Sequence, residues 1–341
     1  MRSMFAEHAP GAAPGEKAPL LPKNGDAAAT RRVEMPHVQG LRFVAMTWII
    51  FFHYLSTEEG SLVGNLVEHR PLDLFTVISG FATHLAYGSQ KRSLGTPIQF
   101  LARRAARLVF TYYLTLSLAF FLKLISLGVH APSMAEVGVE YLAFLLGLLG
   151  LNVWVCPALV LAGQPQGGYW TNHLCWPHNG PLWYIQSLLF CWATYPLLRN
   201  YLSGPDSFFT SRASTCVQIV GWCILGMAPM LVLNVFNLYS VGWLFVKAFP
   251  VFMAPPFYVG VAICDLYKQE LVADAEDKEK SDECGGMWGQ IKRQWGCLLG
   301  EVVLVLWIAF QFVPYTHSES HVWALVFGVI LFFLAVAAAE G

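Results

Sequence analysis

Two ionisable residues, Arg42 and His53, interrupt the apolar run GLRFVAMTWIIFFHYL at residues 40–55. An ionisable group in a membrane helix costs about 2.5 kcal/mol or more at the bilayer centre, so such residues are candidates for function. They are eleven residues apart. On a helix this spacing places both side chains on one face, about 16 Å apart along the axis. The alternative is that Arg42 extends toward lipid phosphates and His53 caps the helix at the interface.

The next apolar run, LDLFTVISGFATHLAYG at residues 72–88, begins with an acidic residue, Asp73. If the two runs form antiparallel neighbouring helices, Asp73 lies level with His53. A carboxylate beside an imidazole fixes its tautomer and raises its basicity, which a general base requires. Further along, Ser79 and Gly80 are small enough to let another helix or a thin ligand approach closely.

Three arginines, Arg103, Arg104 and Arg107, cluster in the segment FLARRAARLVFTYYL. Arg104 and Arg107 are three residues apart and share one helix face, where two guanidinium groups can bind phosphate groups. The alternative is topological, since arginines accumulate at cytoplasmic helix ends. Lys123 lies in the apolar run 108–129. It is a candidate for function as an intramembrane charge, and the alternative is that its side chain extends to the outer surface.

The composition predicts the fold class. The chain has 341 residues, of which 56% are hydrophobic and only 13% charged, whereas soluble domains are about 25% charged. We therefore predict an all-α, polytopic integral membrane bundle of about eight spans. The net charge of −1 gives no indication of a nucleic-acid partner. The eight cysteines include no CxxC pair, so no metal site is expected.

Residues 1–35 are rich in Ala, Pro, Gly and charge, so we expect a disordered cytoplasmic tail before a membrane domain at 36–341. Lys and Arg flank the first apolar run on its N-terminal side, which places His53 at an outer helix end. Basic residues accumulate on the cytoplasmic side of membrane helices. Those from Arg199 onward lie on that side only if the run 140–162 does not cross the membrane. We therefore expect 140–180 to be a re-entrant or surface segment on the outer side. A ninth span is the alternative. Cys156 and Cys175 can form a disulfide there.

Four segments resemble motifs of the acyltransferase-3 family of membrane acyltransferases, which includes O-antigen and other surface-glycan acetylases. Residues 40–54 resemble its Arg or Lys followed by ten residues and His. LDLFTVISGF at 72–81 resembles its VDLFFVLSGF stretch. RRAARLVFTYYL at 103–114 resembles its RRxxRiyPlY stretch, and GPLWYIQSLLFCWATYPLL at 180–198 resembles its WSLSVEEQFYLLFPLL helix, keeping Trp183.

The resemblance implies an O-acyltransferase. The donor would be acyl-coenzyme A, carrying acetyl or a short acyl group, and the acceptor a hydroxyl of a carbohydrate or lipid. No tightly bound cofactor is expected. The donor phosphates would bind Arg103, Arg104 and Arg107 from the cytoplasmic side.

The resemblance also implies roles for the other candidates. His53 would deprotonate the acceptor or carry the acyl group, Asp73 would orient its imidazole, and Arg42 would stabilise the donor. The remaining expected contacts are Ser79 and Gly80 for the donor, and Trp183, His173 and His178 for the acceptor. As loop residues, the two histidines have a plain surface position as their alternative.

The chain departs from the family pattern at three places. Leu188 and Phe110 replace a glutamate and a proline of the family. The family's closing helix with a Ser-Tyr…His ending is missing, so we expect a truncated or alternatively terminated form. Two other functions stay open. One is a small-molecule transporter with a proton relay through Arg42, His53 and Asp73. The other is a catalytically inactive relative that binds lipid or a partner.

Overall fold

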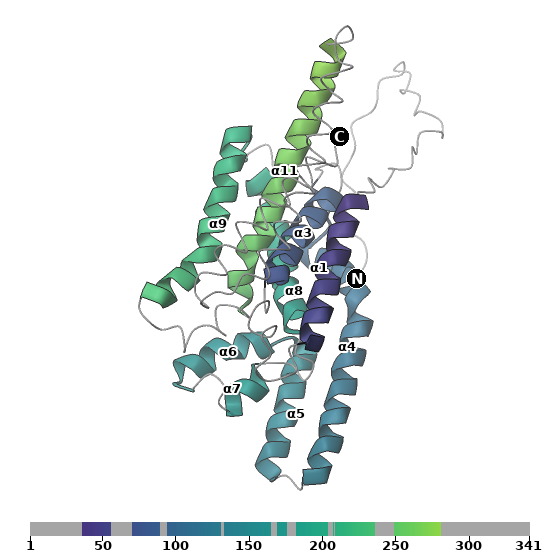
Figure 1. Ribbon diagram of the computed structural model, residues 1–341, viewed down its shortest axis with the longest axis vertical. Coiled ribbons are helices and arrows are strands. Elements are labelled where there is room, and N and C mark those ends of the chain that lie inside the picture. Colours follow the sequence, from purple (N-terminus) through teal and green to yellow (C-terminus); the bar gives the residue numbers. More distant parts are fainter. Residues whose placement is uncertain are drawn as a thin grey trace, which may run out of the picture. The chain divides into compact units, whose positions relative to one another are not determined.

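The computed structural model describes residues 36–55, 70–88, 94–130, 133–164, 169–175, 182–203, 207, 209–235 and 249–280 (Figure 1). Every regular element in these ranges is an α-helix, as predicted. The helices are α1 (Pro36–Leu55), α3 (Arg70–Tyr87), α4 (Pro97–His130), α5 (Met134–Leu149), α6 (Asn152–Leu161), α7 (Tyr169–Leu174), α8 (Leu182–Ser203), α9 (Arg212–Val235) and α11 (Pro250–Lys280). The predicted tail 1–35 and the apolar runs 297–314 and 321–339 lie outside these ranges.

Two of the described helices are long and apolar enough to cross a membrane: Pro97–Gly128 within α4 and Pro250–Gln269 within α11. The apolar runs predicted at 38–55, 72–88, 181–198 and 214–235 are also helical, in α1, α3, α8 and α9. The apolar pattern thus located the helices correctly. That the chain crosses the membrane about eight times stays a prediction.

Helices α3 and α11 pack backbone against backbone. A Cβ atom built on Gly80 of α3 would lie 1.9 Å from the carbonyl oxygen of Phe257 in α11. A Cβ atom built on Gly260 of α11 would likewise lie 1.9 Å from the carbonyl oxygen of Val77 in α3. No side chain fits between the helices at these two points. The small-residue step at Ser79 and Gly80 therefore marks a close helix approach, which was one of its two predicted uses.

The run 140–162 is not one straight helix. Helix α5 ends at Gly150, whose φ of 69° is in the left-handed region that favours glycine, and α6 then begins at Asn152. Helix α5 packs along α4, where the Tyr112 hydroxyl donates to the Gly147 carbonyl at 2.6 Å. The break divides the run into two helices, and the expectation that the segment does not cross the membrane stays a prediction.

Helices α6 and α7 are fixed to their neighbours by two features. Cys156 and Cys175 form the disulfide that the sequence suggested, which joins α6 to the residue after α7. The Asn152 amide donates to the carbonyl oxygens of Ala143 in α5 and Leu174 in α7, both at 3.1 Å. Together they hold α7 against α5.

The contact of α3 with α11 leads to a prediction for stability. Gly260→Ala should lower the free energy of unfolding in detergent by about 1–3 kcal/mol, because the added methyl group forces the helices apart. Gly221→Ala is the matched control: it lies in α9 with no atom within 4 Å of its Cβ position. The control should raise stability by up to about 1 kcal/mol through helix propensity. Equal thermal unfolding midpoints for both variants would contradict the backbone contact.

The disulfide leads to a prediction for topology, because disulfides persist on the non-cytoplasmic side. We expect cysteines introduced at Ser61 and Gly163 to react with a membrane-impermeant maleimide in sealed cells. A cysteine at Thr96, before α4, is the control and should react only after permeabilisation. Reaction of the first two from opposite sides would mean that the 140–162 segment crosses the membrane.

Candidate functional site

Arg104 of α4 directs its guanidinium group into the helix bundle. Its Cζ atom lies 4.9 Å from the ring centre of Tyr87 and 5.6 Å from that of Trp192. The Nε and Nη2 atoms are buried, and no described residue accepts a hydrogen bond from either. Buried guanidinium donors without acceptors are rare and costly in proteins. This arrangement is suited to receive an anion.

Arg42 of α1 adds a second positive charge. It is half-buried and lies within electrostatic range of both Arg104 and the hydroxyl of Tyr184 in α8. No described carboxylate forms an ion pair with either arginine. Two arginines from different helices thus contribute positive charge to the same part of the bundle without an acidic partner from the described residues.

The three arginines predicted to bind phosphate lie in different surroundings, and their binding of phosphate stays a prediction. Arg103 donates from Nε to the Gln99 carbonyl at 3.2 Å, and its Nη2 donates to the carbonyl of Leu94. Arg107 is exposed and lies within electrostatic range of Arg104. Only Arg104 turns its guanidinium inward between aromatic rings. The structure therefore separates one inward arginine from two that spacing alone could not distinguish.

The predicted base and its carboxylate lie on neighbouring helices. Helix α1, which carries His53 in its last turn, contacts α3, which carries Asp73 in its first turn. Asp73 is half-buried. The side chain of His53 lies outside the described part of the structure, so its pairing with Asp73 stays a prediction.

The remaining predicted residues fall in different surroundings. Ser79 is buried, and the nearby Thr76 hydroxyl lies 3.3 Å from the Tyr184 hydroxyl. The backbone of α11 occupies the space beside Gly80 where a side chain would lie. Trp183 is buried in the apolar core. His173 lies in α7, with Nδ1 2.7 Å from a carboxylate oxygen of Glu140, and His178 lies outside the described residues. The roles predicted for these residues in donor or acceptor binding stay predictions.

The structure brings together a buried polar network that sequence reasoning missed. His84 of α3 has Nε2 2.6 Å from Asp265 Oδ1 in α11 and Nδ1 2.9 Å from the Tyr195 hydroxyl in α8. Ser203 donates to the other Asp265 oxygen, and Lys268 lies 3.7 Å from Oδ1. A histidine inside an apolar run was the available signal, the same one that singled out His53. The network ties three helices together beside the arginines.

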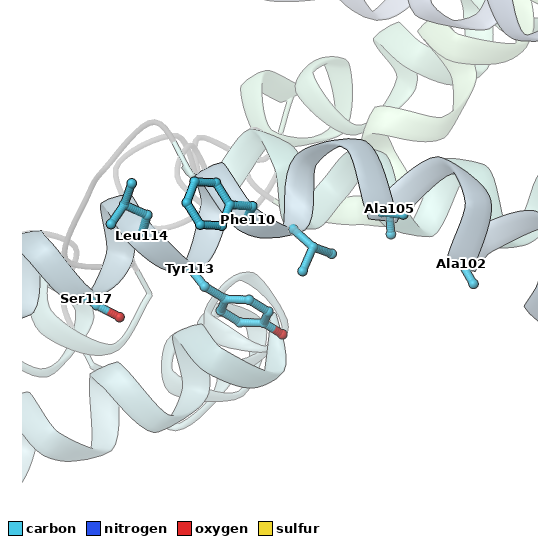
Figure 2. Close-up of a pocket in the computed structure, with 8 residues that line it drawn as sticks. Ala102, Ala105, Phe110, Tyr113, Leu114 and Ser117 are labelled. Atoms are coloured by element: carbon cyan, nitrogen blue, oxygen red, sulfur yellow. The ribbon is translucent and has the colours of Figure 1, made fainter.

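A shallow groove of about 780 Å³ runs along the exposed face of α4 (Figure 2). It is lined by Ala102, Ala105, Ala106, Val109, Phe110, Tyr113, Leu114 and Ser117. The lining carries no charged side chain, so it does not provide the charge complementarity that a phosphate group needs. The inward face of α4, with Arg104, is the better candidate for a polar ligand.

Comparison with known proteins identifies the family. The family model described as an acyltransferase domain, that of the acyltransferase-3 family, matches residues 36–340. Comparison with curated proteins gave no match, and comparison with solved structures gave none either. The match covers every described helix, together with the segments that carry the arginine and histidine motifs. The chain therefore belongs to the acyltransferase-3 family and is a membrane acyltransferase.

Proposed function

We propose that the protein transfers a short acyl group from acyl-coenzyme A to a hydroxyl group of a carbohydrate or lipid acceptor. The observation that carries this proposal is the buried Arg104 guanidinium, whose Nε and Nη2 have no acceptor among the described residues. Its neighbour Arg42 adds a second charge. A phosphorylated donor supplies the negative charge that both arginines require.

The position of the arginines fits an elongated donor. Arg104 lies in the third turn of α4, whose start we place on the cytoplasmic side from the Lys and Arg distribution. Arg42 lies near the start of α1. His53 lies on the same face of this helix, about 16 Å further along its axis. The donor phosphates would bind near Arg104, and the acyl arm would extend along α1 toward His53.

The proposed chemistry is a direct transfer. His53 accepts the proton of the acceptor hydroxyl, and the resulting oxygen nucleophile attacks the thioester carbonyl carbon. The new C–O bond forms, the C–S bond breaks, and the coenzyme A thiolate leaves and takes up the proton that the His53 imidazolium releases. Asp73 holds the imidazole in the tautomer that can accept the proton, and it stabilises the imidazolium that forms.

The family's glutamate position does not contribute an acid in this chain. Leu188 occupies it and is 5% exposed within the apolar core. The neighbouring Gln186 donates to the Tyr112 hydroxyl at 2.8 Å and to Asn152 at 3.1 Å, so it joins α8 to α4 and α6. Proton transfer is therefore assigned to His53, with Asp73 as the group that orients its imidazole.

The donor site can be tested by replacing the arginines one at a time. Arg104→Gln and Arg42→Gln should each weaken coenzyme A binding by about 1.5–3 kcal/mol, the usual value of a charge-assisted hydrogen bond. Arg103→Gln is the comparison variant, because its guanidinium already binds two backbone carbonyls. It should change the dissociation constant little. Equal losses in all three variants, measured by calorimetry in detergent, would favour a diffuse surface site instead.

The base can be tested by separating turnover from binding. His53→Ala should abolish acyl transfer while it leaves the dissociation constant of acetyl-coenzyme A nearly unchanged, since a proton acceptor acts in the chemical step. Asp73→Asn should retain a small residual rate, because it misorients the imidazole without removing it. Transfer by the unmodified enzyme should rise with pH through the neutral range. Wild-type turnover in His53→Ala would remove the role of proton acceptor proposed for this histidine.

A further inference from the structure

The exposed face of α4 carries a groove that the proposed donor site does not use. This α4 groove has a volume of about 780 Å³ and is lined only by residues of α4, between Ala102 and Ser117 (Figure 2). The other described helices leave most of this apolar helix uncovered. A groove on a lipid-facing helix can hold one lipid molecule in a fixed place if its shape and its charge fit that lipid.

The shape of the α4 groove fits an extended hydrocarbon chain. Alanines at positions 102, 105 and 106 cover the helix backbone thinly, whereas the rings of Phe110 and Tyr113 project from the same helix (Figure 2). Phe110 is 75% exposed and occupies the position of the family's proline. Tyr113 is held in place because its hydroxyl donates to the Leu148 carbonyl of α5 at 3.1 Å. Long apolar surface between fixed rings suits an acyl chain.

A positive charge lies on the same helix face, toward the start of α4. Arg107 is exposed, and no described carboxylate forms an ion pair with it. It lies three residues before Phe110 and seven before Leu114, so the arginine and these two lining residues share one face of the helix. The groove lining itself is uncharged. An amphipathic ligand would therefore place its anionic group on Arg107 and its apolar part in the groove.

The distance from the charge to the far end of the groove matches one leaflet of a bilayer. Ser117 follows Arg107 by ten residues, which is about 15 Å along a helix axis. The hydrocarbon core of a bilayer is about 30 Å thick, so each leaflet contributes about 15 Å. The apolar run 108–129 begins directly after Arg107, which places the arginine at the edge of the core. A phospholipid has its phosphate at this edge and the end of its acyl chain near the midplane.

We propose that the α4 groove binds an acyl chain of one anionic phospholipid and that Arg107 binds the phosphate of its headgroup. A phospholipid with a cationic headgroup group gains less from Arg107, because that group repels the guanidinium. The Lys and Arg distribution also places the start of α4 at the cytoplasmic leaflet, where anionic lipids accumulate. This lipid site is separate from acyl transfer and does not depend on it.

Photo-crosslinking of the full-length protein in detergent tests the site. The probe is phosphatidylserine with a diazirine near the end of its acyl chain. After irradiation, the tryptic peptide 108–123 should carry the label, and labelling should saturate at one lipid per chain. Label spread over the apolar helices without saturation would overturn the proposal, because it would show only general contact with lipid.

Competition identifies the chemistry that the site recognises. Unlabelled phosphatidylserine should displace the probe, and phosphatidylcholine should need about a fivefold higher concentration for the same effect. Glycerol phosphate, which has no acyl chain, and coenzyme A should not compete. Equal competition by the two phospholipids would overturn the preference for an anionic lipid. Displacement by coenzyme A would overturn the proposal by returning Arg107 to the donor site.

Matched variants test the charge. Arg107→Gln should lower labelling by the phosphatidylserine probe about fivefold. Arg103→Gln is the control, because its guanidinium already binds two backbone carbonyls. It should change labelling less than twofold. Full labelling in Arg107→Gln, or an equal loss in both variants, would overturn the role of Arg107.

A second pair of variants tests the groove. Ala106→Leu should lower labelling severalfold, because the larger side chain fills the groove. Thr111→Leu is the control: it adds a similar side chain at an exposed position of α4, about 140° around the helix from Ala106. Both variants should keep α4 intact, because leucine favours the helix. Full labelling in Ala106→Leu, or an equal loss in both variants, would overturn the groove as the binding site.

Discussion

The structure depends on the contact between α3 and α11, where Gly80 and Gly260 leave no room for a side chain. This contact brings His84 within hydrogen-bonding distance of Asp265, and the same network then holds α8 through Tyr195 and Ser203. Once α8 is fixed, its aromatic side chains are in place. The Trp192 ring lies against the Arg104 guanidinium, and Tyr184 lies within electrostatic range of Arg42. A packing constraint between two helices thus positions charged groups on two others.

The two polar regions differ in how their charges are balanced. Both ring nitrogens of His84 and both carboxylate oxygens of Asp265 have hydrogen-bond partners, so this network joins helices and leaves no polar atom of the pair for a ligand. Arg104 carries buried donors without acceptors from the described residues. A buried donor without a hydrogen bond costs its full desolvation free energy, and a bound anion removes that cost. This contrast is the reason for assigning structure to the first region and donor binding to the second.

The sequence predicted the helical class, the positions of the described helices and the family, because long apolar runs and short motifs are local features. It also identified the close approach at Gly80 and the pairing of Cys156 with Cys175. It did not predict that Arg103 binds backbone carbonyls while Arg104 turns inward. Helical spacing shows which residues share a face of the helix, but it does not show which residues of other helices that face contacts. His84 and Asp265 are 181 residues apart, and no local pattern connects positions so distant. Glu140 escaped notice for the same reason, because only the folded chain places it between Lys123 and His173.

We propose above all that Arg42 and Arg104 bind the phosphates of an acyl-coenzyme A donor inside the helix bundle. The most direct measurement is a cryo-electron microscopy structure of the His53→Ala variant with acetyl-coenzyme A, in which the donor is not consumed. We expect phosphate density within hydrogen-bonding distance of the Arg104 Nε and Nη2 atoms, with the acyl arm directed along α1. Phosphate density on Arg103 and Arg107 at the surface, with Arg104 still without an acceptor, would contradict it.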